Sequence, residues 1–215
     1  MDGVLYDSMP DHVQAWVETL NDWGVSAEPS DIYMLEGRTG NTTIDIFFNK
    51  NFRRDATQDE KEKIYKQKAA RFVELNQTIK LIPGSHAVLT RVKQLGLKRV
   101  IVTGSGQPTL FNSLNDHFPG FFENDLMVTA FDVQHGKPHP EPYLMALRKA
   151  NVKAEEAIVI ENAPLGIESA VAAGIYTIAV NTGPLLDEIL LKAGASVLFP
   201  SMKALSEDGI WDKII

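Results

Sequence analysis

The sequence predicts an α/β fold, in which a parallel β-sheet is covered on both faces by helices and the first third of the chain is helical. After residue 82, short β-branched runs alternate with amphipathic helical patterns. Alternation of this kind is typical of parallel sheets. Residues 10–80 lack the two-residue alternation of apolar and polar side chains that a half-buried strand shows. The chain therefore divides into a helical zone and a sheet zone.

Composition narrows the class of protein. The 215 residues are 44% hydrophobic and 23% charged, as in ordinary globular domains. The formal charge of −7, without a Lys/Arg cluster, argues against nucleic acid or an anionic membrane as a partner. The absence of cysteine excludes disulfides and cysteine-based metal sites, and it fits a reducing cytoplasm. No run approaches the roughly 20 apolar residues of a membrane helix.

Helical spacing of apolar residues predicts three helices in the first zone. The first has Asp11 as its N-cap and Gly24 as its stop. A short helix is expected at residues 44–48, where isoleucine and phenylalanine cluster. A longer helix begins at Thr57, because Glu60 three residues later completes a capping box.

The sheet zone alternates helices with strands. Helices are expected at residues 87–95, 108–116, 140–150, 164–173 and 184–193. Strands are expected at the β-branched runs 99–102, 126–129, 157–160, 176–180 and 196–199. Ligands of parallel sheets bind beyond the carboxyl ends of the strands, so the residues just after each strand are the candidates for chemistry.

Two segments after these strands favour an anion. Thr103, Gly104 and Ser105 supply hydroxyls and backbone N–H groups before a helix that Pro108 opens, which suits phosphate, although a tight turn uses the same residues. Lys137 lies among prolines before the next helix. A lysine is electrostatically unfavourable at the N-terminus of a helix unless an anion lies close to it. Lys137 therefore either binds an anion or is a solvated lysine of the loop.

Two further positions carry acidic or amide groups. Glu161 and Asn162 directly follow a strand and offer the hard oxygen ligands that suit Mg²⁺. Asn162 could instead cap the helix that starts near Pro164, whereas glutamate is a weak cap residue. Asp2, taken alone, fits a solvated terminus.

Together and in this order, these segments resemble the haloacid dehalogenase superfamily of phosphotransferases. Asp2-Gly3-Val4 resembles the tail of its first motif, Asp-x-Asp-Gly-Val. Thr103 resembles the hydroxyl of the second motif and Lys137 the lysine of the third. Glu161-Asn162 resembles the fourth motif, with asparagine where aspartate is commoner.

The helical zone resembles the mobile cap of the β-phosphoglucomutase-like branch of that superfamily. His12, Trp16 and the run 35–42 match the first cap helix and the substrate-specificity loop of the branch. The resemblance implies a Rossmann-like parallel sheet core, residues 1–9 and 82–215, with a helical-bundle cap, residues 10–81, inserted after the first motif. Hinges are expected at residues 7–10 and 79–84.

The resemblance also implies a phosphoaspartate mechanism. One aspartate attacks phosphorus, and a second, matched by Asp2, protonates the leaving oxygen and then activates the acceptor. Mg²⁺ is the implied cofactor, with Asn162 and the Asp2 carbonyl as ligands and Glu161 as a ligand or a partner of one. The phosphoryl oxygens would be held by Thr103, Lys137 and the backbone of Gly104 and Ser105.

The matched first motif puts the nucleophile two residues before Asp2. The resemblance also puts the central strand of the sheet there, and a sheet without it would have a slot with two unpaired edges. We therefore expect Met1 to be the internal methionine of an Asp-Met-Asp-Gly motif, and the natural protein to begin several residues earlier. If the nucleophile is truly absent, the chain is a catalytically dead module that binds phosphate or a partner.

The acceptor distinguishes a hydrolase, which uses water, from a mutase, which uses a sugar hydroxyl. Mutases of the branch carry basic residues near the positions of Glu36 and Gly40 to hold the far phosphate of their substrate. Glu36 would repel that phosphate unless a metal lay between them, although Arg38 could substitute as the basic group. Glu36 could instead complete the Mg²⁺ shell and suit a small, highly charged substrate; an exposed loop carboxylate is the alternative.

We expect a Mg²⁺-dependent phosphohydrolase that acts on a small phosphate substrate, inorganic pyrophosphate or a sugar phosphate. β-Phosphoglucomutase is the alternative, which His12 and Trp16 favour. The protein is expected to be a cytoplasmic monomer that binds neither nucleic acid nor membrane. Substrate-binding residues are expected in the cap at His12, Trp16, Glu36, Gly37, Arg38, Thr39 and Asn41.

Overall fold

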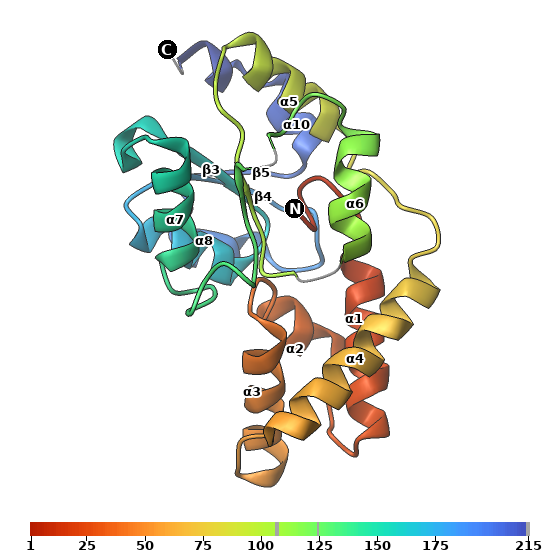
Figure 1. Cartoon of the computed structure of the whole chain (residues 1–215). Helices are drawn as coiled ribbons and strands as arrows, with labels where there is room; N and C mark the ends of the chain where they lie inside the picture. The colour runs from red at the N-terminus through yellow and green to blue at the C-terminus, as the bar shows by residue number, and fades with distance from the viewer. Residues whose placement is uncertain (106–107, 124, 214–215) are drawn as a thin grey trace.

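Helices from the first third of the chain lie together at one end of the molecule, and the strands with the later helices form the other end (Figure 1). This computed structural model describes residues 1–105, 108–123 and 125–213, with the backbone alone for 108–112. The predicted α/β fold with a helical cap is confirmed.

The cap consists of helices α1–α4. Their bounds are α1 Met9–Asp22, α2 Pro29–Met34, α3 Gly40–Phe52 and α4 Gln58–Leu75. Side chains from these helices form one buried cluster that includes Trp16, Leu20, Ile44, Phe47 and Ile64. The expected capping box at Thr57 and Glu60 is present. Helix α2 was not predicted, because six residues give too little periodicity to recognise.

The predicted N-cap of the first helix is wrong. Ser8, not Asp11, is the N-cap, and α1 begins at Met9. Pro10 fits the first turn because it has no N–H group to leave unpaired there, which moves the helix start upstream of Asp11. Ser8 makes no side-chain capping bond, since its hydroxyl donates elsewhere. The expected stop is present, with Gly24 in the left-handed region at φ +70°.

The strands form two parallel ladders in the described residues. Their bounds are β1 Ile101–Val102, β2 Met127–Val128, β3 Ile158–Glu161, β4 Tyr176–Val180 and β5 Val197–Phe199. Strand β4 has the predicted bounds, β3 is shifted by one residue, and β1, β2 and β5 are shorter than predicted. Strand β1 pairs with β2, while β4 lies between β3 and β5. One hydrophobic cluster joins the ladders, because it contains Ile101 from the first and Ile178 from the second.

Helices cover both faces of the strands. Helices α5, α6 and α10 contribute Val88, Leu114 and Leu205 to a cluster that also holds Ile178. On the other side, Tyr143 of α7 and Ala170 of α8 pack with Val159. The bounds are α5 Ser85–Gln94, α6 Pro108–His117, α7 Glu141–Ala150, α8 Pro164–Ala172, α9 Asp187–Lys192 and α10 Met202–Glu207. Short 3₁₀ helices occur at Ala154–Glu156 and Gly209–Lys213.

Two connectors link the cap to the strands, and they run antiparallel beside each other. The amide of Asp7 donates to the carbonyl of Lys80 at 2.9 Å, and the amide of Ile82 donates to the carbonyl of Leu5 at 2.9 Å. Both expected hinge segments therefore meet at one place.

Within the described residues, no helix combines the length and apolar character needed to cross a bilayer.

Candidate active site

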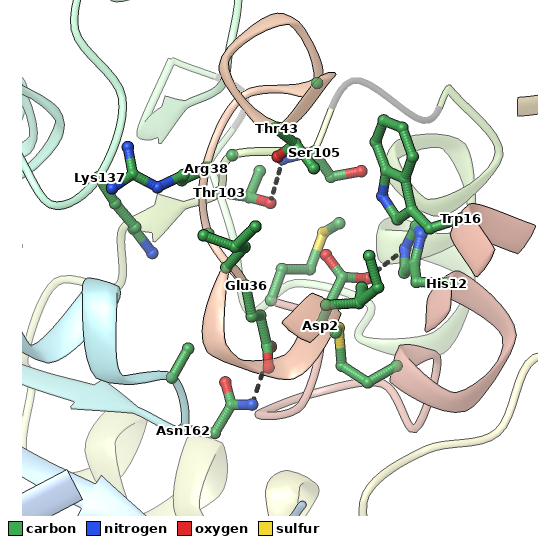
Figure 2. A pocket seen from close by; sticks show the side chains of 18 of the residues that line it. Asp2, His12, Trp16, Glu36, Arg38, Thr43, Thr103, Ser105, Lys137 and Asn162 are labelled. Carbon is green, nitrogen blue, oxygen red and sulfur yellow. Dashed lines mark hydrogen bonds and ion pairs between the residues drawn. The ribbon is translucent and has the colours of Figure 1, made fainter. Parts of the chain in front are cut away.

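A cavity of about 90 Å³ lies where the α2–α3 loop, residues 35–39, meets the carboxyl ends of β1 and β3 (Figure 2). Loops after parallel strands are where this architecture binds ligands. Most of the predicted site residues line it: Asp2, His12, Trp16, Glu36, Gly37, Arg38, Thr103, Gly104, Ser105, Lys137, Glu161 and Asn162. Residues more than 150 positions apart in sequence thus share one cavity.

Lys137 forms a buried ion pair with Glu161. The two residues are 5% and 6% exposed. The Lys137 ammonium donates to Glu161 Oε1 and, at 3.4 Å, to the carbonyl of Val102 at the end of β1. It also lies 5.1 Å from the centre of the Tyr143 ring. Lys137 is therefore a fixed cation at the cavity wall rather than a solvated loop lysine.

The Glu161 carboxylate is saturated by protein donors. Besides Lys137, the Tyr143 hydroxyl donates to Oε1 at 2.9 Å, and the amides of Asn162 and Ala163 donate to Oε2 at 2.9 and 3.2 Å. Burial would raise the pKa of Glu161, but Lys137 and these donors hold it below its usual value. Gly166 is required beside it, because a Cβ there would lie 2.1 Å from Oε1.

Thr103 is held at the floor of the cavity. Its side chain is buried, and its Oγ1 accepts a hydrogen bond from the Ser105 amide at 3.0 Å. The Thr103 amide donates to the carbonyl of Val128, which extends the β1–β2 ladder by one bond. The threonine hydroxyl is thus oriented by the turn that follows β1.

Asp2 is surrounded by groups from helix α1. The Ser8 hydroxyl donates to Asp2 Oδ1 at 2.7 Å, and His12 Nε2 lies 3.5 Å from the same oxygen. Burial would raise the pKa of Asp2, but contacts with His12 and Ser8 outweigh burial, so this pKa lies well below its usual value. Asp2 is therefore an ionised carboxylate at neutral pH.

Lys68 of helix α4 is a site residue that was not predicted. It is 3% exposed, and its ammonium lies 2.7 Å from His12 Nδ1. An ammonium only donates, so Nδ1 accepts and the ring hydrogen is on Nε2, toward Asp2. Burial lowers the pKa of Lys68 to about 7. Its position halfway between Ile64 and Phe72 on the buried stripe of α4 was the available signal.

His12 is neutral in this setting. Burial and the charge of Lys68 lower its pKa to about 4, although Asp2 opposes them. Its ring stacks on Phe72, with centroids 3.9 Å apart and planes inclined by 11°. Trp16 lines the same wall, 5.3 Å from the Lys68 ammonium.

Replacing Lys68 by methionine is expected to raise the pKa of His12. The substitution keeps an apolar side chain of similar length but removes the neighbouring charge and the hydrogen bond to Nδ1, both of which favour the neutral ring. The pH titration of the His12 ring protons by NMR measures this, with exposed Lys66→Met on the same helix as control. A pKa that stays near 4 would contradict this account of the pair.

Glu36 reaches from the cap to the core. Asn162 Nδ2 donates to Glu36 Oε1 at 2.8 Å, and Figure 2 shows the two side chains meeting below the cavity. Burial and the charges of Glu161 and Asp2 raise the pKa of Glu36 to about 8, against the Asn162 hydrogen bond. Glu36 is thus not an exposed loop carboxylate.

The rest of the α2–α3 loop differs in part from expectation. Thr39 and Asn41 do not line the cavity, because Thr39 is the N-cap of α3, accepting from the Thr42 amide at 3.5 Å, and Asn41 lies exposed in the first turn of that helix. Arg38 points to the Lys137 side of the cavity, away from Glu36 (Figure 2). Its buried Nε has no hydrogen-bond partner among the described atoms.

The donor set at this edge of the cavity fits a hard divalent cation in its chemistry. Glu36 and Asn162 supply side-chain carboxyl and amide oxygens and Asp2 supplies a backbone carbonyl, and hard oxygen ligands of this kind are the ones that Mg²⁺ prefers. Burial is the main cause of the raised pKa of Glu36 and the charges of Glu161 and Asp2 add to it, so a cation bound here would favour the ionised form of Glu36. Among the described residues, no three His, Asp or Glu side chains converge closely enough to hold a metal by themselves.

Relatives of this chain include sugar phosphatases. Hexitol phosphatase A of Escherichia coli is 28% identical over 88% of this chain and 85% of its own length. A phosphorylated carbohydrates phosphatase of Thermotoga maritima is 30% identical over 92% of this chain and 90% of its own. A solved structure, of a candidate β-phosphoglucomutase from Bacteroides vulgatus, is 49% identical and superposes with a TM-score of 0.94, covering all of this chain and 86% of its own.

The fold, the site and these relatives define an enzyme of the phosphatase or phosphotransferase type. The sequence profile of the family described as haloacid dehalogenase-like hydrolase matches residues 1–180. The chain belongs to this family, so the resemblance drawn from its motifs is confirmed.

Proposed function

We propose that the protein is a Mg²⁺-dependent phosphohydrolase that prefers inorganic pyrophosphate to larger phosphate esters and forms its phosphoaspartate on the nucleophilic aspartate that the first-motif resemblance implies, with Asp2 as the acid and base. The observation that carries this proposal is Glu36, which comes from the cap and meets Asn162 at 2.8 Å. A cation bound beside Glu36 would lower its pKa and keep it ionised, and an ionised Glu36 favours a substrate that shares this metal and disfavours a bare second phosphate in the cap.

The size of the cavity supports a compact substrate. Its volume is about 90 Å³, whereas pockets for larger ligands usually measure about 300–1,000 Å³. A sugar phosphate would need the cap to stand further from the strands than it does here. Pyrophosphate concentrates its charge and its reacting atoms in a small volume.

The protonation state of Asp2 supports the same substrate. Asp2 is ionised at neutral pH, so it is ready to accept the proton of an attacking water molecule. A departing sugar alkoxide needs a proton, whereas departing phosphate carries its charge without one. An ionised Asp2, which cannot protonate the leaving group, therefore slows the cleavage of a phosphate anhydride less than it slows the cleavage of a sugar ester.

The other polar residues of the cavity then have distinct tasks. Lys137 and Thr103, with the backbone of Gly104 and Ser105, hold the phosphoryl oxygens, and Glu161 orients Lys137. Glu36, Asn162 and the backbone carbonyl of Asp2 would hold Mg²⁺, which supplies charge neutralisation at the phosphoryl group, and the Asp2 side chain stays available as the base. Because protein donors saturate Glu161, we assign it a positioning role rather than a metal bond.

β-Phosphoglucomutase is the second candidate. His12 and Trp16 line the cavity, as the resemblance implies for a sugar acceptor site, and the similar Bacteroides vulgatus protein is a candidate mutase. We further propose that residues 10–81 move as a cap over the core. The proposed working unit is a monomer in the cytoplasm.

A phosphate-release assay tests the proposal. The protein is given pyrophosphate, both anomers of glucose 1-phosphate and glucose 6-phosphate, each with Mg²⁺ or with EDTA. We expect kcat/KM for pyrophosphate to exceed that for every sugar phosphate by about tenfold or more, and EDTA to abolish release. Conversion of β-glucose 1-phosphate to glucose 6-phosphate as the fastest reaction would replace the proposal with the mutase.

A further inference from the structure

Two glycines of the core face the α2–α3 loop of the cap, and their backbone conformations do not require glycine. Gly104 follows β1, and Gly136 precedes Lys137. Neither has a positive φ, in contrast to Gly37, which has φ +94°. An alanine at either core position would therefore adopt the same backbone without strain. Some other constraint must keep the side chain absent.

The α2–α3 loop of the cap is that constraint. A Cβ on Gly104 would lie 2.3 Å from the carbonyl oxygen of Gly37, and a Cβ on Gly136 would lie 2.8 Å from Thr39 Cγ2. Between them, a Cβ on Gly37 would lie 3.0 Å from Lys137 Cδ. The cap loop thus rests almost directly on the core backbone at two separate points.

These contacts determine how far the cap descends. Glu36 precedes Gly37 in the same loop and reaches Asn162 on the core only because the loop is seated this closely. A loop held further away would enlarge the cavity and separate Glu36 from Asn162. Seating and cavity size are therefore linked through the same few residues.

We propose that Gly136, together with Gly104, sets the substrate size limit of the enzyme by allowing the cap loop to seat on the core backbone. Gly136 is a specificity-determining residue that acts through the position of Glu36 and does not touch the substrate. The inference rests on the proposed preference for pyrophosphate. It adds that this preference is built into the contact between cap and core, and not only into the groups that meet the substrate.

A suppressor pair tests this directly. Gly136→Ala introduces one methyl group against Thr39 Cγ2, and Thr39→Ser removes that methyl while keeping the hydroxyl that caps α3. We expect Gly136→Ala to lower kcat/KM for pyrophosphate about tenfold and to leave that for glucose 6-phosphate unchanged or higher, because one inserted methyl commonly costs that factor in a packed contact. Adding Thr39→Ser restores the pyrophosphate value to within about twofold.

A distance measurement gives a readout besides activity. The chain has no cysteine, so Lys66→Cys on the cap and Glu155→Cys on the core, both exposed, can carry spin labels without background labelling. With Mg²⁺ and inorganic phosphate present, we expect a longer label distance in Gly136→Ala than in the unsubstituted protein, and a return of the distance with Thr39→Ser. Gly104→Ala should lengthen it as well.

Other outcomes overturn the proposal. Equal losses on both substrates, or no recovery with Thr39→Ser, would show that Gly136 does not act through the cap. If the unsubstituted protein fails to hydrolyse pyrophosphate, the proposed function fails, and the label distances still decide whether Gly136 controls seating. Thermal unfolding controls for folding. If Gly136→Ala unfolds, Gly104→Ala takes its place in the distance measurement alone, because the Gly104 backbone also meets the phosphoryl group, and an unchanged distance there counts against the proposal.

Discussion

Replacing Glu36 by alanine is expected to lower kcat/KM for pyrophosphate by about 100-fold and to raise the Mg²⁺ concentration that gives half-maximal rate, since removing even a residue that only orients a metal ligand typically costs about 10–100-fold. The substitution removes the cap carboxylate that meets Asn162 and deletes one of the oxygen donors proposed for the metal. Glucose 6-phosphate hydrolysis should change by less than about threefold, because a larger ester depends less on full seating of the cap. Steady-state kinetics across a Mg²⁺ series measures both effects.

Two controls separate the charge of Glu36 from its size. Glu36→Gln keeps the shape and can still accept a hydrogen bond from Asn162, so it should retain folding but lose most of the Mg²⁺ effect. Glu74→Ala removes an exposed cap carboxylate far along α4 and should leave the kinetics unchanged. A small, equal loss on every substrate in Glu36→Ala would mean that Glu36 takes no part in the reaction.

Replacing Glu161 by glutamine is expected to destabilise the fold by about 3–5 kcal/mol, the usual result of leaving one charge of a buried pair unpaired. Lys137 is 5% exposed and has no other carboxylate partner among the described residues, so its ammonium would remain in an apolar setting without a counter-charge. Urea unfolding followed by circular dichroism gives the change in free energy.

The double variant Lys137→Met/Glu161→Gln should recover most of that loss, because both charges are then absent. Exposed Glu168→Gln on α8 serves as the matched control and should be neutral. The pair also predicts a pH dependence. The folded-state pKa of Glu161 lies below its ordinary value of 4.5, so its contribution is complete above that pH and is lost as the pH falls through the folded-state pKa. Full stability of Glu161→Gln would contradict the buried-pair account.

The strands and their ends could be predicted because the signal there is local. A β-branched run followed by polar residues, as at 157–162, needs only neighbours in sequence to be recognised. The parallel arrangement then predicted that Thr103 and Glu161 would lie at the same edge, and both line one cavity. For Glu36 the sequence leaves two alternatives open, a role beside the metal site and an exposed loop carboxylate. The hydrogen bond from Asn162 to Glu36 agrees with the first.

The differences from expectation have two origins: packing between distant segments for Lys68, and local capping for Ser8 and Thr39. Lys68 contacts His12, which is 56 positions away in the sequence. The only local signal of this contact is that Lys68 is a cation on the apolar stripe of α4. Ser8 displaced Asp11 as N-cap because Pro10 shifted the helix start. Thr39 and Asn41 were assigned to substrate from the loop resemblance, whereas α3 starts at Gly40 and uses Thr39 as its cap.

The paired connectors have a consequence for how readily a very small molecule can shut the enzyme. The hydrogen bonds Asp7–Lys80 and Leu5–Ile82 hold the two connectors side by side, so the proposed movement of the cap would hinge at one place. Association of two separate molecules costs about 4–15 kcal/mol of free energy in lost translational and rotational freedom. A cap that is tethered to the core by two joined connectors loses much less of this freedom when it closes. Pyrophosphate, the proposed substrate, has only two linked phosphate groups and can make few contacts. With a cap that is already tethered to the core, few contacts would suffice to hold the closed position.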